Sequence, residues 1–160
     1  MNYLHEIEDE IKRLGFQIIS KDFDRPWGGF LVISEQQAQE FADKFFDGID
    51  VENIKIGGKL SPKILVVKPN SKLSWQYHHR RAEIWKVFKG KVGVSRSFDD
   101  NEKPLKKLIT GDQIKLKKGE RHRLIGLDDF AVIAELWQHT DPSNLSNEDD
   151  VIRLSDDYGR

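Results

Sequence analysis

Three side chains that could bind a metal ion lie close together in the stretch LSWQYHHRRAEIWKVFKG, residues 73–90. Gln76 and His78 are two positions apart, so on an extended strand they point to the same face. A turn through residues 79–82 would return Glu83 to that side at the start of the next strand. An imidazole, a carboxylate and an amide oxygen that meet at one point can bind a single divalent metal ion.

A second stretch, GDQIKLKKGERHRLIG at residues 111–126, offers a fourth ligand. It contains an alternating strand, a polar turn with Gly119, and then His122 leading into another strand. A lone histidine is more often structural, but two linked stretches that share glycine, turn and histidine make a stronger pattern. The predicted metal ligands are therefore Gln76, His78, Glu83 and His122.

The two stretches resemble the two motifs of the cupin superfamily. The first cupin motif is usually written HxH followed by a glutamate and a glycine, and Gln76 stands here at the first histidine. The second motif is present with Gly111, Gly119 and His122, while Lys117 and Gly126 stand where proline and asparagine are usual. The resemblance implies a mostly β fold, the cupin double-stranded β-helix or jelly-roll barrel.

Further segments resemble the C-terminal cupin domain of type II mannose-6-phosphate isomerases. They are RPWG at 25–28, QYHHRRAEIW at 76–85, HRL at 122–124 and DVIRLSDDYGR at 150–160. Ile84 stands where that family commonly has a histidine. In bacteria the domain is often fused to a mannose-1-phosphate guanylyltransferase, and because that half is missing here we expect no nucleotidyl transfer.

The resemblance implies a metal-dependent aldose–ketose isomerase for mannose 6-phosphate and fructose 6-phosphate, with one divalent ion per chain. Zinc is the first expectation, followed by manganese, iron, nickel or cobalt. The ion would stabilise an enediolate as a Lewis acid, and a base would move the proton between the sugar carbons.

Glu135 is the predicted base, because it lies among apolar neighbours on the strand after His122, where burial raises a carboxyl pKa. His79 is a second candidate, on the face opposite His78. Arg153 joins Glu135 as a candidate catalytic residue, from its position in the family. The predicted substrate-binding residues, which would contact the phosphate, are Arg25, Arg81 and Arg160.

Two other classes of function remain open. One is a different metal-dependent cupin enzyme, such as an Fe(II) dioxygenase, against which Gln76 argues because oxygen-activating cupins generally keep the histidine. The other is a non-catalytic cupin that binds a sugar and regulates. Within the isomerase class, a heptose or another phosphosugar could replace mannose 6-phosphate.

Composition and charge limit the compartments and partners that we expect for this protein. The 160 residues carry a formal net charge of −1, so no long-range field favours nucleic acid or an anionic membrane. No apolar run is long enough to span a bilayer, the acidic N-terminus lacks the features of a signal peptide, and there are no cysteines. We expect a cytoplasmic protein whose partner is a small phosphosugar, with a homodimer as the default assembly.

A single domain over residues 1–160 is expected, in three parts. A helical N-terminal extension covers 1–50, with helices at 2–14 and 34–46, a short strand at 16–19 and a tight turn within 22–33. Asn2 is the predicted cap of the first helix, and Ser34 with Gln37 a capping box for the second. The barrel core covers 54–138, and a tail, 139–160, folds back on it. The predicted barrel strands are 63–68, 74–78, 84–89, 91–98, 105–108, 113–116, 122–125 and 130–137.

Overall fold

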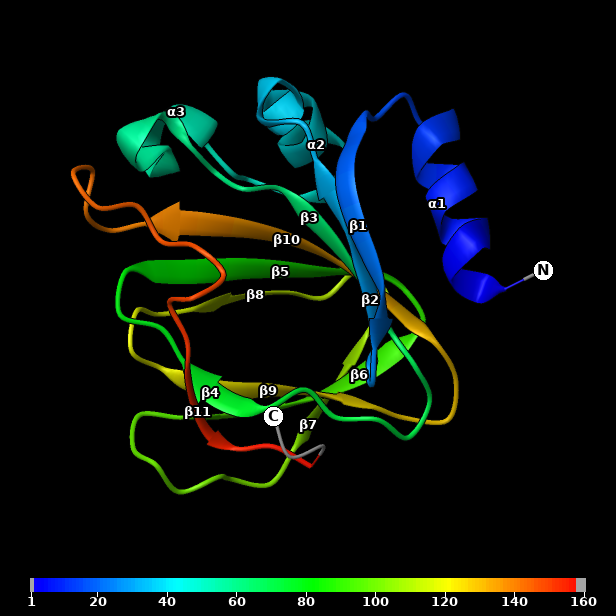
Figure 1. Ribbon diagram of the computed structural model, residues 1–160, viewed down its shortest axis with the longest axis vertical. Helices are drawn as coiled ribbons and strands as arrows, with labels where there is room; N and C mark the ends of the chain where they lie inside the picture. The colour runs from blue at the N-terminus through cyan, green and yellow to red at the C-terminus, as the bar shows by residue number, and fades with distance from the viewer. Residues whose placement is uncertain (1, 158–160) are drawn as a thin grey trace.

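The structure is a computed structural model that describes residues 2–157, and it consists of two facing antiparallel sheets with helices on one side (Figure 1). The six-stranded sheet has the order β1 (Ile18–Arg25), β2 (Gly28–Ile33), β3 (Lys63–Val67), β10 (Ala131–His139), β5 (Arg81–Lys89) and β8 (Gln113–Leu116). The five-stranded sheet has the order β11 (Ile152–Ser155), β4 (Trp75–Tyr77), β9 (Arg121–Gly126), β6 (Lys91–Ser97) and β7 (Lys106–Ile109). This is the jelly-roll barrel that the sequence predicts, and every predicted barrel strand is present to within a few residues.

Side chains alternate across the six-stranded sheet and create two separate cores. On β3, Ile64 and Val66 pack outward in one cluster with the helices, whereas Leu65 and Val67 pack into the barrel. On β10 the outward residues Ala134 and Leu136 follow the same rule. Polar residues in the inward register of these strands are therefore placed inside the barrel, where a buried site can form.

The helices cover the outer face of the six-stranded sheet (Figure 1). They are α1 (Tyr3–Arg13), the 3₁₀ turn η1 (Glu35–Gln37), α2 (Ala38–Phe45), the short α3 (Val51–Ile54) and the 3₁₀ turn η2 (Ile56–Gly58). The Asn2 cap is confirmed, because its side chain accepts a hydrogen bond from the Leu4 N–H at 2.7 Å. None of the described helices is long and apolar enough to cross a membrane.

The second helix starts later than predicted, and the predicted capping box is wrong. The Ser34 side chain makes no capping hydrogen bond, and residues 35–37 form a 3₁₀ turn before α2 begins. Gln37 instead accepts a hydrogen bond from the Gln17 N–H at 2.7 Å and donates one to the Gly15 carbonyl at 2.9 Å. These longer-range partners compete successfully with the local cap that sequence spacing suggests.

Residues 1–50 contain more than the predicted helices. The tight turn predicted within 22–33 is present at 26–27, but it joins two strands, β1 and β2, in a hairpin, and β2 pairs with β3 of the barrel. The short strand predicted at 16–19 begins later and is longer, as β1. At the other end of the chain the tail folds back as expected. There β11 pairs with β4, and Arg153 lies opposite Gln76 in that pairing. Arg160 lies outside the described residues.

Gly28 sits where β2 passes very close to β3. Its φ is +139°, and a Cβ placed there would lie 2.0 Å from the backbone oxygen of Val66. Gly15 has φ of +96°, but a Cβ added there would meet nothing within 4 Å. An alanine at position 15 would therefore strain the backbone, as at position 28, but would not clash with a neighbour. We expect Gly28→Ala to lower the free energy of unfolding by about 3 kcal/mol or more, and Gly15→Ala by about 1 kcal/mol. Urea denaturation of both variants checks this, and equal losses would contradict the close approach.

Candidate metal centre

Three of the four predicted ligands meet inside the barrel. One ligand atom each from His78, Glu83 and His122 lies within 4.8 Å of the others, and all three residues are buried. His78 Nε2 is 3.5 Å from Glu83 Oε2, and His122 Nε2 is 3.3 Å from Glu83 Oε1. The two imidazole rings flank the carboxylate, with their centroids 5.0 Å apart.

Both sheets contribute to this cluster. His78 follows β4 directly and His122 lies on β9, both in the five-stranded sheet, while Glu83 lies on β5 of the facing sheet. Gln76 is the register partner of His122 and lines the same cavity, and its Oε1 accepts a hydrogen bond from the Ser74 hydroxyl. Its position agrees with a ligand role, which itself stays a prediction.

The outer nitrogens of both histidines face backbone carbonyls. His78 Nδ1 is 2.6 Å from the Asp150 carbonyl oxygen, and His122 Nδ1 is 3.0 Å from that of Glu120. A carbonyl can only accept, so Nδ1 carries the proton in each ring and Nε2 presents its lone pair to the centre. His122 Nε2 is buried without a hydrogen-bond partner among the described residues. The donor set and this orphaned nitrogen fit a divalent metal ion.

The charges agree with that reading. Burial opposes ionisation of Glu83, but the neighbouring His78, Arg81 and His122 hold its pKa well below its usual range. Burial, opposed by Glu83, lowers the pKa of His78 to about 4. At neutral pH the carboxylate is therefore charged and the imidazole neutral, which are the forms that bind a metal.

Arg81, predicted to bind substrate, is engaged with the ligands themselves. Its Nε donates to Glu83 Oε2 at 2.9 Å, its Nη2 lies 3.3 Å from His78 Nε2, and its guanidinium stacks 3.6 Å from the centre of the Trp137 ring. Its Nη1 donates to the Ser146 hydroxyl at 2.9 Å and the Asn147 carbonyl at 3.0 Å. With these donors occupied, the structure shows Arg81 as a buried counter-charge for Glu83.

Glu135, the predicted base, lies in the same cavity. It is buried on β10, next to Trp85 in the strand pairing, and its Oε1 accepts a hydrogen bond from Trp85 Nε1 at 3.3 Å. Burial, with the Glu83 charge nearby, raises the pKa of Glu135 to about 8. Two carboxyls thus share one cavity with opposite pKa shifts, a combination typical of acid–base sites.

Some of the remaining predicted residues line the cavity and others lie away from it. Arg25 and Arg153 both line the cavity; Arg25 lies 3.0 Å from Asp22, and Arg153 lies on the exposed strand β11. His79 is exposed beside Tyr77 and does not line the cavity, so it is wrong as an alternative base. Ile84 packs into the outer core with the helices, and its difference from the family pattern therefore removes no contact from the cavity.

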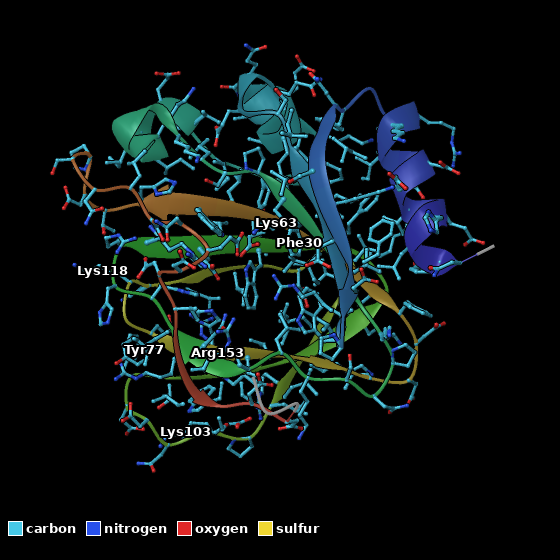
Figure 2. All side chains as sticks on the ribbon, viewed as in Figure 1. Phe30, Lys63, Tyr77, Lys103, Lys118 and Arg153 are labelled. Carbon is cyan, nitrogen blue, oxygen red and sulfur yellow. The ribbon has the colours of Figure 1, made fainter. Side chains whose placement is uncertain are left out.

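The cavity itself has a volume of about 440 Å³, enough for a small ligand. It also contains Lys63, which sequence reasoning missed. The signal was present, because Lys63 shares the strand register of the inward residues Leu65 and Val67. In Figure 2 the labelled Lys63 and Phe30 lie by the upper sheet and Arg153 by the lower one.

Comparison with known proteins identifies the family. Residues 48–156 match the family described as "Mannose-6-phosphate isomerase C-terminal". The xanthan biosynthesis protein XanB of Xanthomonas campestris pv. campestris is 36% identical over 110 residues, covering 68% of this chain and 22% of that protein. The mannose-1-phosphate guanylyltransferase of Escherichia coli K12 is 30% identical over 142 residues, covering 89% of this chain and 24% of that protein. The chain thus spans less than a quarter of these relatives.

Solved structures confirm the fold. Vicilin from hazelnut (Corylus avellana) aligns with a TM-score of 0.56 at 15% identity, over 80% of this chain and 34% of that one. CapF, crystallised with an inhibitor, aligns with a TM-score of 0.54 at 16% identity, over 87% of this chain and 34% of that one. At such identities the likeness shows the architecture alone.

We expect His122→Ala to weaken the binding of Zn²⁺ by more than about 100-fold, because it removes one of three converging ligands. Isothermal titration calorimetry measures the affinity, and far-UV circular dichroism shows whether the barrel remains folded. His79→Ala is the matched control, since His79 is the exposed neighbour of a ligand. Wild-type affinity in His122→Ala would remove that residue from the site.

We expect Glu135→Gln to raise the free energy of unfolding of the metal-free protein at pH 7 by roughly 1–3 kcal/mol. The carboxyl has a pKa near 4.5 when unfolded and about 8 when folded. Between these values the unfolded state releases the proton and the folded state keeps it, so stability falls as pH rises. Urea denaturation at pH 5 and pH 7 should show this decline in the wild type and a smaller one in the variant. Identical pH dependence in the two proteins would contradict the raised pKa.

Proposed function

Since the chain belongs to the mannose-6-phosphate isomerase C-terminal family of cupin domains, we propose that it is a metal-dependent sugar-phosphate isomerase interconverting mannose 6-phosphate and fructose 6-phosphate. The observation that carries the proposal is the cavity shared by a metal-ligand cluster and the buried carboxyl of Glu135. Isomerisation needs both functions, because a weak carbon acid must lose a proton to a base while its oxygens gain charge.

His78, Glu83 and His122 would hold the metal, with Gln76 as the proposed fourth ligand. A divalent ion bound there supplies Lewis acidity that stabilises negative charge developing on the sugar oxygens. These ligands would come from β4 and the residue after it, from β9, and from β5 of the facing sheet. A catalytic ion held by them would keep a position for substrate oxygens.

Glu135 would carry the proton between adjacent sugar carbons. Its pKa of about 8 lets it take up a proton and release it again near neutral pH, which suits transfer in both directions. The Trp85 N–H holds one oxygen of this carboxyl in place. The apolar side chains of Trp85 and Leu65 line the same cavity, and such surroundings favour the neutral form of the Glu135 carboxyl.

Arg25 and Arg153 line the cavity and would contact the phosphate, together with Arg160 from outside the described residues. Arg153 reaches the cavity from the tail strand opposite Gln76, so the tail would complete the site.

One observation favours a second function. The Arg81 guanidinium lies against both Glu83 and His78, so a cation already balances the ligand carboxylate. A cupin that binds a phosphosugar without catalysis could be held together in this way. A dioxygenase remains the weaker alternative because Gln76 replaces a histidine that such cupins generally keep.

The relatives' names refer to xanthan biosynthesis and to guanylyl transfer, yet this chain covers about a quarter or less of their length. Guanylyl transfer is therefore no part of the proposal. The identity of the metal as zinc, a cytoplasmic location and a homodimer stay predictions.

We expect the zinc-loaded protein to incorporate deuterium from heavy water into mannose 6-phosphate and fructose 6-phosphate, because the abstracted proton exchanges with solvent. NMR of the sugar carbons measures the exchange. Glu135→Gln should lower its rate by about 100-fold or more while Zn²⁺ affinity stays unchanged. Absence of exchange across a panel of phosphosugars, with binding retained, would contradict catalysis and favour the non-catalytic cupin.

A further inference from the structure

Lys63 is a buried lysine inside the cavity with no role so far. The whole residue is 5% exposed and lies at the start of β3. Its Nζ lies 4.7 Å from the centre of the Phe30 ring and 4.6 Å from the centre of the Trp137 ring. Lysine is rarely buried, because removing its charge from water is costly unless a partner compensates. A cation held at this cost on the inner face of a barrel needs an explanation.

The compensating partner is Glu148, which contacts Lys63 Nζ through Oε1. The two side chains differ greatly in exposure, with Lys63 at 7% and Glu148 at 60%. Lys63 remains almost buried on the inner face of the barrel, whereas Glu148 is exposed and can be solvated by water when it releases Lys63. The pair is therefore a fixed buried cation with an exchangeable anion.

The backbone around Glu148 is anchored on both sides. Before it, the Asn147 carbonyl accepts a hydrogen bond from Arg81, and after it the Asp150 carboxylate accepts from the N–H groups of His79 and Arg80. In Figure 1 this segment leaves β10 and runs from the six-stranded sheet to β11 in the five-stranded sheet. Exchange therefore requires only rotation of the Glu148 side chain, without opening of the segment.

A second donor in the cavity is free to bind an acceptor. Trp137 Nε1 is buried and has no hydrogen-bond partner among the described residues. Its ring lies next to Lys63 Nζ, and Trp137, Lys63 and Glu148 all line the cavity of the metal centre. A buried ammonium beside an unsatisfied N–H suits a ligand with several acceptor oxygens and negative charge, which is the description of a phosphate.

We propose that Lys63 binds the phosphate of the substrate, and that Glu148 is the counter-ion that leaves Lys63 when this phosphate enters. The identity of the ligand as a phosphosugar rests on the proposed function. The assignment adds Lys63 on β3 to Arg25 on β1 and Arg153 on β11 as proposed phosphate contacts. It also makes Glu148 a competitor of the substrate phosphate for Lys63.

The first test compares two lysines. Lys63→Met removes the charge and keeps most of the stem, and we expect 10- to 100-fold weaker binding of inorganic phosphate and mannose 6-phosphate. Lys86→Met is the matched control, because Lys86 is also a strand lysine (13% exposed) paired with a surface carboxylate, Asp47 (91% exposed). Lys86 does not line the cavity, so its variant should bind as the wild type does. Isothermal titration calorimetry at fixed ionic strength measures both.

The second test removes the competitor. Glu148→Gln should tighten binding of inorganic phosphate several-fold, since Lys63 no longer exchanges one anion for another, while the control Asp47→Asn should change nothing. This second experiment tests the phosphate assignment even if Lys63→Met fails to fold. Wild-type phosphate affinity in Lys63→Met, or unchanged or weaker affinity in Glu148→Gln, overturns the proposal.

The two proposals can fail separately. Phosphosugar binding that depends on Lys63 without deuterium exchange would support the phosphate assignment and refute the isomerase. Deuterium exchange with the same KM for mannose 6-phosphate in wild type and Lys63→Met would support the isomerase and refute the assignment.

Discussion

The charge on Glu83 is the constraint on which the interior of this barrel depends. A carboxylate removed from water is tolerated only when opposite charge and hydrogen-bond donors surround it. Here the guanidinium of Arg81 donates to it, and the imidazoles of His78 and His122 flank it on the facing sheet. The two sheets are thus joined by a polar cluster that lies beside the apolar core of the barrel.

That cluster is held in place by the tail of the chain. Asp150 orients His78 through its carbonyl and fixes the turn after His78 through its carboxylate, while Ser146 and Asn147 engage Arg81. Beyond Asp150, β11 places Arg153 opposite Gln76. The segment after β10 therefore belongs to the site as much as the barrel strands do, and His78 acquires its tautomer from a backbone group far away in sequence.

Ionisable groups of both signs face the cavity, and the surroundings stabilise the charged form of each to a different degree. Glu83 is stabilised as an anion, Glu135 is disfavoured as one, and Lys63 depends on a carboxylate that reaches in from solvent. Such unequal balances are what a site needs if it must bind a cation, move a proton and accept an anionic ligand in the same small volume. A core built only for stability would contain apolar side chains at these positions.

The sequence alone determined the barrel strands and the candidate metal ligands, because each follows from patterns within short stretches of the chain. Alternation with a period of two identifies strands, and the spacing of Gln76, His78 and Glu83 around a turn survives folding almost unchanged. The burial of Glu135 followed in the same way from its apolar neighbours.

Only the tertiary structure decided how the long polar and charged side chains are partnered. Gln37 bonds to Gln17 and Gly15 in place of its predicted cap, and Arg81 pairs with Glu83 where a free phosphate contact was expected. Lys63 lies inside the barrel by its strand register, but its carboxylate partner, Glu148, comes from the segment between β10 and β11. Long polar side chains choose partners by distance in space, and that distance depends on strand pairings between segments remote in sequence, which no local pattern encodes.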